Sequence, residues 1–169
     1  MLAGDNINVR TAQWEFNEDV ARVFDDHVRK SVPLYLEGHD LITKISDFYI
    51  HKDSVCYDIG SSTGALARKL AYRHLSKRGV RVVGVEKETG MIKQARDEGN
   101  PGNCEFVCAD VCEYEFEQAS FVTAYYTLQF LRKEARRGIV GKVYDALEEG
   151  GAFVLFEKVY AVSARFQGG

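Results

Sequence analysis

The sequence lacks the long apolar run that a membrane-spanning helix requires. No stretch approaches the ~18 consecutive apolar residues of such a span, and the N-terminal MLAGDNINVR contains no apolar signal-peptide core. We therefore expect a cytoplasmic protein without membrane contact. An excess of basic charge is also missing, since the formal net charge is −3, and direct binding to nucleic acid is not expected. A basic segment at 132–142 is interpreted as a solvated helix face.

Motifs for metal binding are absent as well. Cys104, Cys108 and Cys112 are evenly spaced, but the segment 104–110, CEFVCAD, has the apolar pattern of a strand. Four residues of strand span ~13 Å, which is too far for two thiols to share one zinc ion. We therefore expect no metal and interpret the cysteines as free, buried side chains. The histidines form no ligand motif either: His27, His39, His51 and His74.

What the sequence does contain is a regular alternation of strand and helix patterns in its second part. Short apolar segments, typical of buried strands, alternate with segments whose apolar residues have helical spacing. The expected strands are 54–60, 80–86, 104–110, a segment that begins at 119, and 151–160. The expected helices are 64–75, 90–99 and 133–147. This alternation predicts an α/β fold: a Rossmann-like, doubly wound parallel sheet of about five strands with helices on both faces.

The N-terminal part has a different pattern. Residues 14–50 contain no obvious strand and are interpreted as two amphipathic helices broken at Pro33. These helices either pack on the sheet or cover the ligand cleft, and periodicity does not distinguish the two. Residues 53–160 then form the Rossmann-like core, and residues 1–169 are expected to be a single ligand-binding domain.

The turn after the first expected strand is the main functional motif. Residues 57–64, YDIGSSTG, contain two glycines four positions apart and an acid two positions before the first. A dinucleotide site has the pattern G-x-G-x-x-G, but Ser62 stands at the position of the middle glycine. The carboxylate of Asp58 favours instead a cationic ligand such as S-adenosylmethionine (SAM), which carries a sulfonium and an ammonium group. Gly60 and Gly64 allow the turn to run close beneath the methionyl part.

Acidic residues also end the next two expected strands. Glu86 closes the second strand, where the two ribose hydroxyls of a nucleoside would reach a carboxylate. Asp110 closes the third, where a carboxylate can accept a hydrogen bond from an adenine amino group, with Ala109 and Val111 against the ring. An acid after each of the first three strands is the pattern of a SAM site, because the carboxyl ends of parallel strands meet at one edge.

The spacing Asp58-x-Gly60-x-x-x-Gly64 resembles the first motif of class I SAM-dependent methyltransferases, and longer segments resemble the carboxy-SAM synthase family. The segments that carry this second resemblance are 16–35, 57–66, 109–122, 126–131 and 155–159, and they include SVPLY and YTLQFL. The resemblance implies a class I methyltransferase fold with SAM as cofactor and reactant. It also implies conversion of SAM to carboxy-SAM with prephenate, a small-molecule substrate, for tRNA wobble-uridine modification.

The resemblance implies roles for individual residues. Tyr35 would reach the cofactor from the N-terminal helices, and it is a candidate catalytic residue. The other implied contacts are Gly60, Ser61 and Ser62 to the methionyl part, Glu86 to the ribose, and Asp110 and Val111 to the adenine.

Three departures from the family pattern change these expectations. Glu86-Lys87 replaces the usual Asp-Asn pair and keeps a carboxylate, and Lys87 stays among the cofactor-binding candidates. Tyr125 stands where family members carry an asparagine that contacts the carboxylated end of the cofactor, so it is a candidate for both binding and catalysis. The chain ends soon after the fifth expected strand, before the family's carboxylate-binding arginine. Arg29 and Arg165 are nearby substitutes that do not align with it.

From these departures we expect SAM binding with weak or absent synthesis of carboxy-SAM. We also expect a homodimer, because the strand at 151–160 would form a sheet edge that a second copy can pair. Simple methyl transfer and a SAM-binding module without turnover are the alternative functions. A nicotinamide-dependent oxidoreductase is disfavoured by Ser62 and by Asp110.

Overall fold

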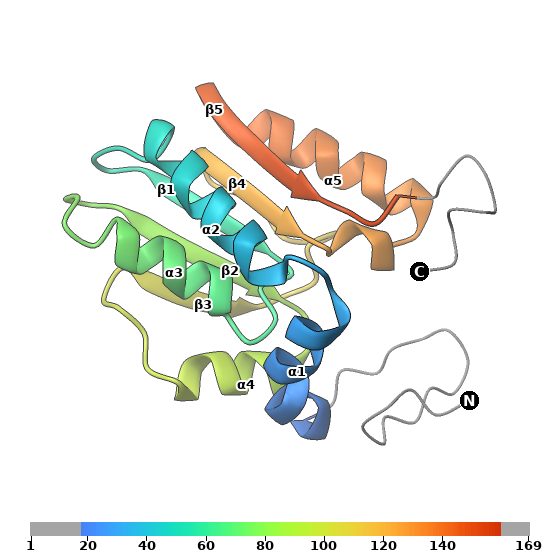
Figure 1. Ribbon diagram of the computed structural model, residues 1–169. Helices are drawn as coiled ribbons and strands as arrows, with labels where there is room; N and C mark the ends of the chain where they lie inside the picture. Colours follow the sequence, from blue (N-terminus) through green and yellow to red (C-terminus); the bar gives the residue numbers. More distant parts are fainter. Residues whose placement is uncertain (1–17, 160–169) are drawn as a thin grey trace.

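The computed structural model describes residues 18–159, which form one parallel sheet with helices on both faces (Figure 1). The strands are β1 (Val55–Ile59), β2 (Arg81–Glu86), β3 (Cys104–Cys108), β4 (Ala119–Tyr125) and β5 (Leu147–Phe156). Their order is β3-β2-β1-β4-β5, and every neighbouring pair is parallel. The predicted five-stranded, doubly wound α/β fold is therefore confirmed, and its switch point lies between β1 and β4.

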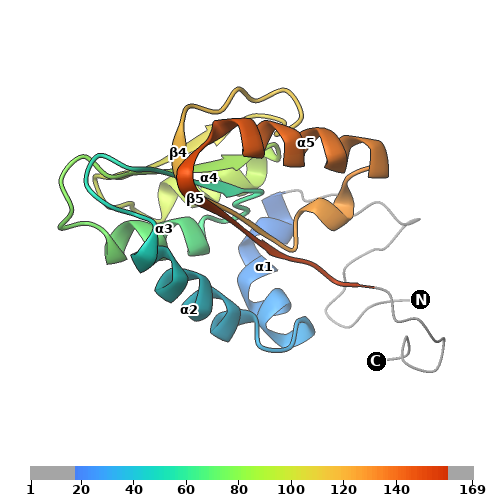
Figure 2. The ribbon, with the colours of Figure 1, turned by 90° about the horizontal axis from the view of Figure 1, so that it is seen from above.

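The helices are divided between the two faces of this sheet. They are α1 (Glu18–Ser31), α2 (Tyr35–Ile45), α3 (Ala65–Arg73), α4 (Thr89–Asp97) and α5 (Lys133–Ala146), with 3₁₀ turns at Ser46–Phe48 and Leu128–Phe130. Residues of α2, α3 and α4 belong to the core on one face, and residues of α5 to the core on the other. Figure 2 shows α2 and α3 on the side of the sheet opposite α5. Right-handed crossovers between parallel strands produce this arrangement.

Alternate residues of each central strand supply the two halves of the core, because successive side chains of a strand point to opposite faces. On β1, Cys56 belongs to the cluster with α2, α3 and α4, whereas Tyr57 belongs to the cluster under α5. On β2, Val82 and Val83 divide in the same way. Burial on both faces thus explains why these strands appear in the sequence as nearly continuous apolar runs.

The N-terminal helices fulfil both of the roles that periodicity leaves open. α1 ends at Ser31 and α2 begins at Tyr35, so the helices are broken around Pro33 as predicted. The α2 residue Ile42 is fully buried in the core against the sheet. α1 packs instead beside α4, and its residue Phe24 lies in the wall of a large cavity.

The boundary between α5 and β5 differs from the prediction. The sequence predicts that the fifth strand begins at residue 151, after a helix that stops at a glycine pair. In the structure α5 ends at Ala146 and β5 follows without a loop. The pairing register between β4 and β5 shifts between Ala119 and Phe121, and Gly150, with a φ of 80°, lies in this irregular part. Here glycine marks a bulge within a strand rather than the end of a helix.

The cysteines are free thiols, as predicted. Cys104 and Cys108 lie at the two ends of β3, which keeps their sulfur atoms apart. Cys56 is buried, Cys104 and Cys112 are half-buried, and Cys108 is exposed. The expectation of burial is therefore wrong for Cys108, because β3 is an edge strand of the described sheet. Among residues 18–159, no three His, Cys, Asp or Glu side chains are placed to hold a metal ion. No helix in this part of the chain is long and apolar enough to cross a membrane.

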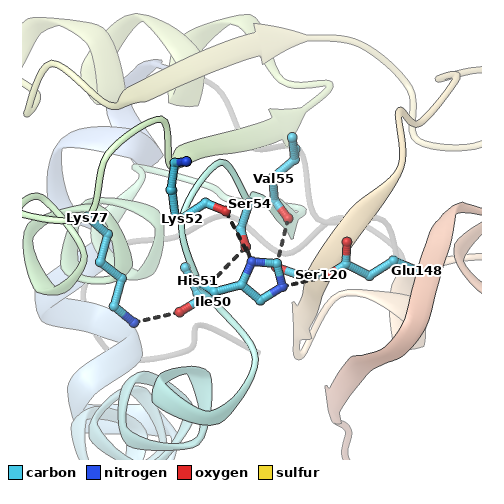
Figure 3. Close-up of polar contacts among 8 residues, drawn as sticks. All are labelled: Ile50, His51, Lys52, Ser54, Val55, Lys77, Ser120 and Glu148. Carbon is cyan, nitrogen blue, oxygen red and sulfur yellow. Dashed lines mark hydrogen bonds and ion pairs between the residues drawn. The ribbon is translucent and has the colours of Figure 1, made fainter.

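Polar contacts join the segment before β1 to β5, and β4 to β1, near the amino ends of the strands (Figure 3). The Nε2 atom of His51, in the segment before β1, lies 2.9 Å from Oε1 of Glu148 in β5. The hydroxyl of Ser54 accepts a hydrogen bond from the backbone N–H of His51 at 2.9 Å, and the hydroxyl of Ser120 donates to the carbonyl oxygen of Val55 at 3.4 Å. These contacts lie at the end of the sheet opposite the carboxyl ends of the strands.

Candidate functional site

A cavity of about 1320 Å³ opens at the carboxyl ends of β1, β2 and β4, where doubly wound sheets bind their ligands. Sites for a single small ligand typically measure ~300–1,000 Å³, so there is room for a second molecule beside a nucleoside-sized one. The site residues predicted from the sequence line this cavity, with the exception of Gly64: Tyr35, Asp58, Gly60, Ser61, Ser62, Glu86, Lys87, Asp110, Val111 and Tyr125.

The turn after β1 brings the backbone against the cavity. Gly60 has a φ of 68°, in the left-handed region that glycine tolerates best. A Cβ on Gly60 would overlap the side chain of Thr127, whose hydroxyl donates to the carbonyl oxygen of Ile59 at 2.8 Å. Ser62, with a φ of 52°, is also left-handed. Gly60 is therefore needed both for the turn and for the close approach of the segment that follows β4.

Gly64 lies outside the cavity wall. It precedes α3 with a φ of 83°, and a Cβ there would overlap the ring of Phe106. The two positions of the motif therefore require glycine for different reasons. Gly60 allows the turn at the cavity, and Gly64 allows α3 to pack closely on the sheet. A direct cofactor contact by Gly64 stays a prediction, and packing against Phe106 is the role that the geometry explains.

Asp58 is the buried acid of the site, with only 2% of its surface exposed. The backbone N–H of Ala67 donates to its carboxylate, but Oδ2 has no hydrogen-bond partner among the described residues. Burial raises the pKa of Asp58 to about 7, and the neighbouring carboxylate of Glu86 adds to the rise. The buried hydroxyl of Ser61 also lacks a partner in residues 18–159. Because buried polar atoms are normally paired, these two groups fit a ligand that donates hydrogen bonds or carries positive charge.

Glu86 ends β2 and is held by backbone donors on both sides. Its Oε2 accepts a hydrogen bond from the N–H of Ser62 at 3.0 Å, and its Oε1 accepts one from the N–H of Glu88 at 2.9 Å. Burial raises the pKa of Glu86, and the backbone donors oppose this rise. The ammonium group of Lys87 lies 3.6 Å from the carboxylate of Glu88, and both residues border the cavity. The bond to Ser62 couples the ends of β1 and β2 and fixes a carboxylate beside the turn.

Asp110 and Val111 follow β3 at another part of the cavity wall. Asp110 is exposed, and its Oδ1 accepts a hydrogen bond from the N–H of Cys112 at 2.8 Å, which fixes the local turn. Val111 is buried and packs in the core under α5. An accessible carboxylate beside an apolar side chain suits a flat ring with polar edges, such as a nucleobase.

Three ring side chains form a further part of the wall. The ring of Tyr35 lies 4.6 Å from that of His39 and 5.1 Å from that of Tyr125, measured between centroids. The hydroxyl of Tyr125 donates to the carbonyl oxygen of Tyr35 at 2.8 Å. Burial, followed by the charge of Asp25, raises the pKa of Tyr35, and burial lowers the pKa of His39 to about 4. Tyr35 and His39 are therefore both uncharged at neutral pH.

α1 is tied to the turn after β1. The buried hydroxyl of Thr63 donates to Oδ1 of Asp25 in α1 at 2.7 Å. Phe24, His27 and Val28, which share one face of α1, line the cavity. The helix thus forms part of the cavity wall, and the hydrogen bond between Thr63 and Asp25 holds it beside the turn after β1.

Several wall residues were not found by sequence reasoning. His39, Tyr126 and Lys158 line the cavity, although none was named as a candidate site residue. Tyr126 and Lys158 lie in the segments 126–131 and 155–159 that carry the family resemblance, and this offered a signal for both. No such signal existed for His39. Of the two arginines considered as cations, Arg29 is exposed on α1 and opposes the rise that burial causes in the pKa of Tyr35. Residue 165 lies outside the described residues.

A family model described as a methyltransferase domain matches residues 56–151. The chain belongs to this methyltransferase family. It is also 36% identical over 154 residues to a carboxy-S-adenosyl-L-methionine synthase of Staphylococcus epidermidis, a match that covers 90% of this chain and 67% of the relative. A relative of the same name from Pseudomonas savastanoi is 36% identical over 154 residues, with 86% and 62% covered. This methyltransferase-family chain therefore spans 67% and 62% of the length of these two relatives.

Solved structures share the fold of this family member. A TehB-like SAM-dependent methyltransferase from Corynebacterium glutamicum has a TM-score of 0.63 at 18% identity, covering 85% of this chain and 78% of that one. A complex of DhpI with SAM and HEP has a TM-score of 0.65 at 20% identity, covering 88% and 64%. At such identities the likeness establishes the methyltransferase fold alone.

Proposed function

We propose that this methyltransferase-family chain binds SAM in the cavity and uses it as a reactant on a small molecule. The observation that carries the proposal is the buried carboxylate of Asp58, whose Oδ2 has no partner among the described residues. Glu86 and Asp110, at the ends of β2 and β3, complete a set of three acids around the same cavity. SAM fits this set because it offers a donor or a positive charge to each acid: the sulfonium and ammonium groups, the ribose hydroxyls and the adenine amino group.

The proposed contacts follow the order of the strands. Asp58 and Ser61 would hold the methionyl part, Glu86 would accept from the ribose hydroxyls, and Asp110 would accept from the adenine amino group. The rings of Tyr35 and Tyr125 would bound the sulfonium end, where an aromatic face near a cation contributes about 0.5–2 kcal/mol. When bound, SAM would supply the activated methyl carbon on its sulfonium, which is either transferred to an acceptor or receives a carboxyl group, and this chain orients it and excludes water.

We propose synthesis of carboxy-SAM, with prephenate as the second substrate, as the specific reaction. The names of the two relatives support this proposal. Negative charge would appear on the transferred group, and a cation fixed nearby lowers the energy of that state. Lys158, two residues after the end of β5, lines the cavity, and Arg29 is close enough to Tyr35 to influence its pKa. A role of the product in tRNA wobble-uridine modification, and a cytoplasmic location, would follow from the same proposal.

One observation favours simple methyl transfer as a second candidate. The hydroxyl of Tyr125 is engaged by the backbone of Tyr35 and therefore does not offer a polar group to a carboxylated cofactor. A methyl group needs only an apolar surface beside it and an acceptor in line. A SAM-binding module without turnover is the third form of the proposal.

Binding of SAM tests the feature that the three candidate functions share, and the product formed distinguishes carboxy-SAM synthesis from the other two. SAM or S-adenosylhomocysteine (SAH), at ~100 times its dissociation constant, should add about 2.7 kcal/mol to the free energy of unfolding, and NAD should add nothing. No shift in melting temperature with either sulfur ligand would overturn the binding proposal. Incubation with SAM and prephenate, followed by mass spectrometry, distinguishes carboxy-SAM synthesis from the other two forms. The expectation that this synthesis is weak stays a prediction until that experiment.

A homodimer is a further proposal. β5 is an edge strand of the described sheet, and 45% of the surface of Leu155 on it is exposed. Unpaired edges of this kind can pair with another strand. Light scattering at high protein concentration should give twice the monomer mass, and a monomer mass would refute the proposal.

A further inference from the structure

Backbone conformations that side chains disfavour are concentrated around the cavity. The described residues other than glycine with a φ in the left-handed region are Leu34, Asp53, Ser62 and Tyr126. Ser62 and Tyr126 line the cavity, and Leu34 stands between the lining residues Pro33 and Tyr35. Asp53 lies in the turn before β1, at the opposite end of the sheet. Strained residues often cluster at functional sites, where the surrounding structure enforces them.

Tyr126 is the unexpected member of this set, because a left-handed conformation is unusual for a bulky aromatic residue. Its φ is 55°. The turn that it occupies is fixed by its own N–H, which donates to the carbonyl oxygen of Phe156 at 2.8 Å. The next residues are fixed as well, since Glu157 accepts from the N–H of Leu128 at 2.8 Å. The turn is therefore imposed by its neighbours, and glycine at position 126 would adopt it without strain.

Core packing does not explain why a tyrosine stands there. Tyr126 is a member of neither hydrophobic cluster of the described residues. Its side chain is half-buried, lines the cavity, and meets the ring of Tyr125 edge-on with 4.8 Å between centroids. In a continuing strand, two consecutive side chains would point to opposite faces. The left-handed turn instead brings the ring of Tyr126 beside that of Tyr125 at the cavity.

We propose that Tyr126 is a specificity-determining residue whose ring bounds the space in which the group on the cofactor's sulfur meets its acceptor. The rings of Tyr35, Tyr125 and Tyr126 form a continuous series, with centroids 5.1 Å and 4.8 Å apart. Tyr35, at one end of this series, lines the cavity together with Asp58, which is proposed to meet the cofactor. Tyr126 is the third ring of the series, at the end away from Tyr35, where the acceptor would bind. This inference rests on the proposed function, because it assumes that SAM occupies the site.

Cofactor analogues that differ only in the group on sulfur test this placement without knowledge of the acceptor. Dissociation constants of SAM and S-adenosyl-L-ethionine are measured by calorimetry for the wild type and for Tyr126→Phe, Tyr126→Ala and Tyr126→Gly. One methylene more or less beside an apolar wall changes affinity by about tenfold or more, so a ring that bounds this space should make the wild type and Tyr126→Phe discriminate against the ethyl compound. Tyr126→Ala and Tyr126→Gly should lose that discrimination by about tenfold while binding SAM itself nearly as before.

Melting temperatures of the same variants test the strain. Tyr126→Gly and Tyr126→Ala both lack the ring, but only glycine tolerates the turn, so the glycine variant should melt about 2–4 °C higher. Asp53→Gly, at the left-handed turn on the far end of the sheet, is the matched control and should leave the ratio of the two dissociation constants unchanged.

Unchanged discrimination in both Tyr126→Ala and Tyr126→Gly would overturn the placement of the ring. An equal loss of affinity for both compounds would also overturn it, since Tyr126 would then contact the cofactor as a whole. Equal melting temperatures of the alanine and glycine variants would remove the strain on which the inference depends. If the wild type binds none of SAM, S-adenosyl-L-ethionine and SAH, the proposed function itself is refuted. This outcome is seen in the wild type alone and so is distinct from a failure of the inference about Tyr126.

Discussion

The hydroxyl of Tyr125 occupies the space that a side chain at position 38 would need. A Cβ added to Gly38 would overlap the hydroxyl oxygen and outer ring atoms of Tyr125, and that hydroxyl is held by the carbonyl oxygen of Tyr35 at 2.8 Å. Gly38 lies inside α2, where glycine costs about 1 kcal/mol relative to alanine. α2 is therefore less stable than it would be with alanine at position 38, and the hydroxyl and ring of Tyr125 fill the space left by the missing side chain.

Gly38→Ala should destabilise the protein in spite of the better helix propensity of alanine. Overpacking against a fixed side chain costs about 1–3 kcal/mol, which typically exceeds the ~1 kcal/mol that propensity returns. In a Tyr125→Asn background the space is open, so Gly38→Ala should become stabilising by about 0.5–1 kcal/mol. Urea unfolding of the four proteins measures this change of sign.

Gly141→Ala provides the matched control for that cycle. Gly141 is also inside a helix, α5, but nothing lies within 4 Å of a Cβ built there. Alanine at this position should stabilise the protein equally with either residue at position 125. If Gly38→Ala has the same effect in both backgrounds, Gly38 and Tyr125 are not coupled.

Much of the fold could be predicted because it follows from local pattern. Alternating strand and helix segments imply a parallel sheet, and the carboxyl ends of parallel strands share one edge. The sequence pattern placed each of three acids at or near the end of a strand, and this alone predicted that they lie close together: Asp58, Glu86 and Asp110. The structure places all three around one cavity.

The features that were missed depend on contacts between distant segments. The relation of Gly38 to Tyr125 joins α2 to the end of β4, and no local signal connects them. The bulge at Gly150 depends on the register between β4 and β5, which periodicity does not contain. The exposure of Cys108 depends on the order of the strands across the sheet, because the same apolar pattern would be buried in a central strand.

Thr63→Val should loosen α1 over the cavity. The hydroxyl of Thr63 donates to Asp25 at 2.7 Å, and valine has nearly the same shape without the donor. Loss of a hydrogen bond to a carboxylate costs about 1.5–3 kcal/mol. Hydrogen–deuterium exchange should therefore become faster in α1 while α5 is unchanged. Thr63→Ser keeps the hydroxyl and should retain the wild-type exchange rate, and faster exchange throughout the protein in Thr63→Val would indicate a general loss of stability instead.

Glu86→Ala should weaken SAH binding more than Glu88→Ala does. The carboxylate of Glu86 is fixed by the N–H groups of Ser62 and Glu88. The side chain of Glu88 also borders the cavity, but its carboxylate lies 3.6 Å from the ammonium group of Lys87. Loss of a charge-assisted contact to the ribose should cost about 1.5–3 kcal/mol. Calorimetric titration of both variants measures the difference, and equal dissociation constants would refute the placement of the ribose at Glu86.

Binding of SAM should release a proton. Burial raises the pKa of Asp58 from its ordinary value of 3.8 to about 7, and a bound cation should lower it again. Below pH 7 most of the free protein carries a protonated Asp58, so the ligand must displace that proton. The affinity for SAM should then fall by up to about tenfold for each unit by which the pH is lowered below about 7. Calorimetry in two buffers of different ionisation enthalpy counts the protons released.

Asp58→Asn separates this titration from that of other groups. The variant should bind SAM more weakly at about pH 8 and should lose the pH dependence of binding, because asparagine does not titrate in this range.

The stability of Asp58→Asn at about pH 8 should be higher than that of the wild type, although its affinity for SAM is lower. The folded-state pKa of Asp58 lies above the unfolded value, so the protonated form stabilises the fold fully below about pH 4, and this contribution is lost as the pH rises through about 7. Asp58→Asn should therefore melt at a higher temperature than the wild type at about pH 8 and at a similar temperature at about pH 4. A wild-type protein that releases no proton on binding SAM, and whose pH dependence persists in Asp58→Asn, would show that Asp58 is not the group that meets the cation.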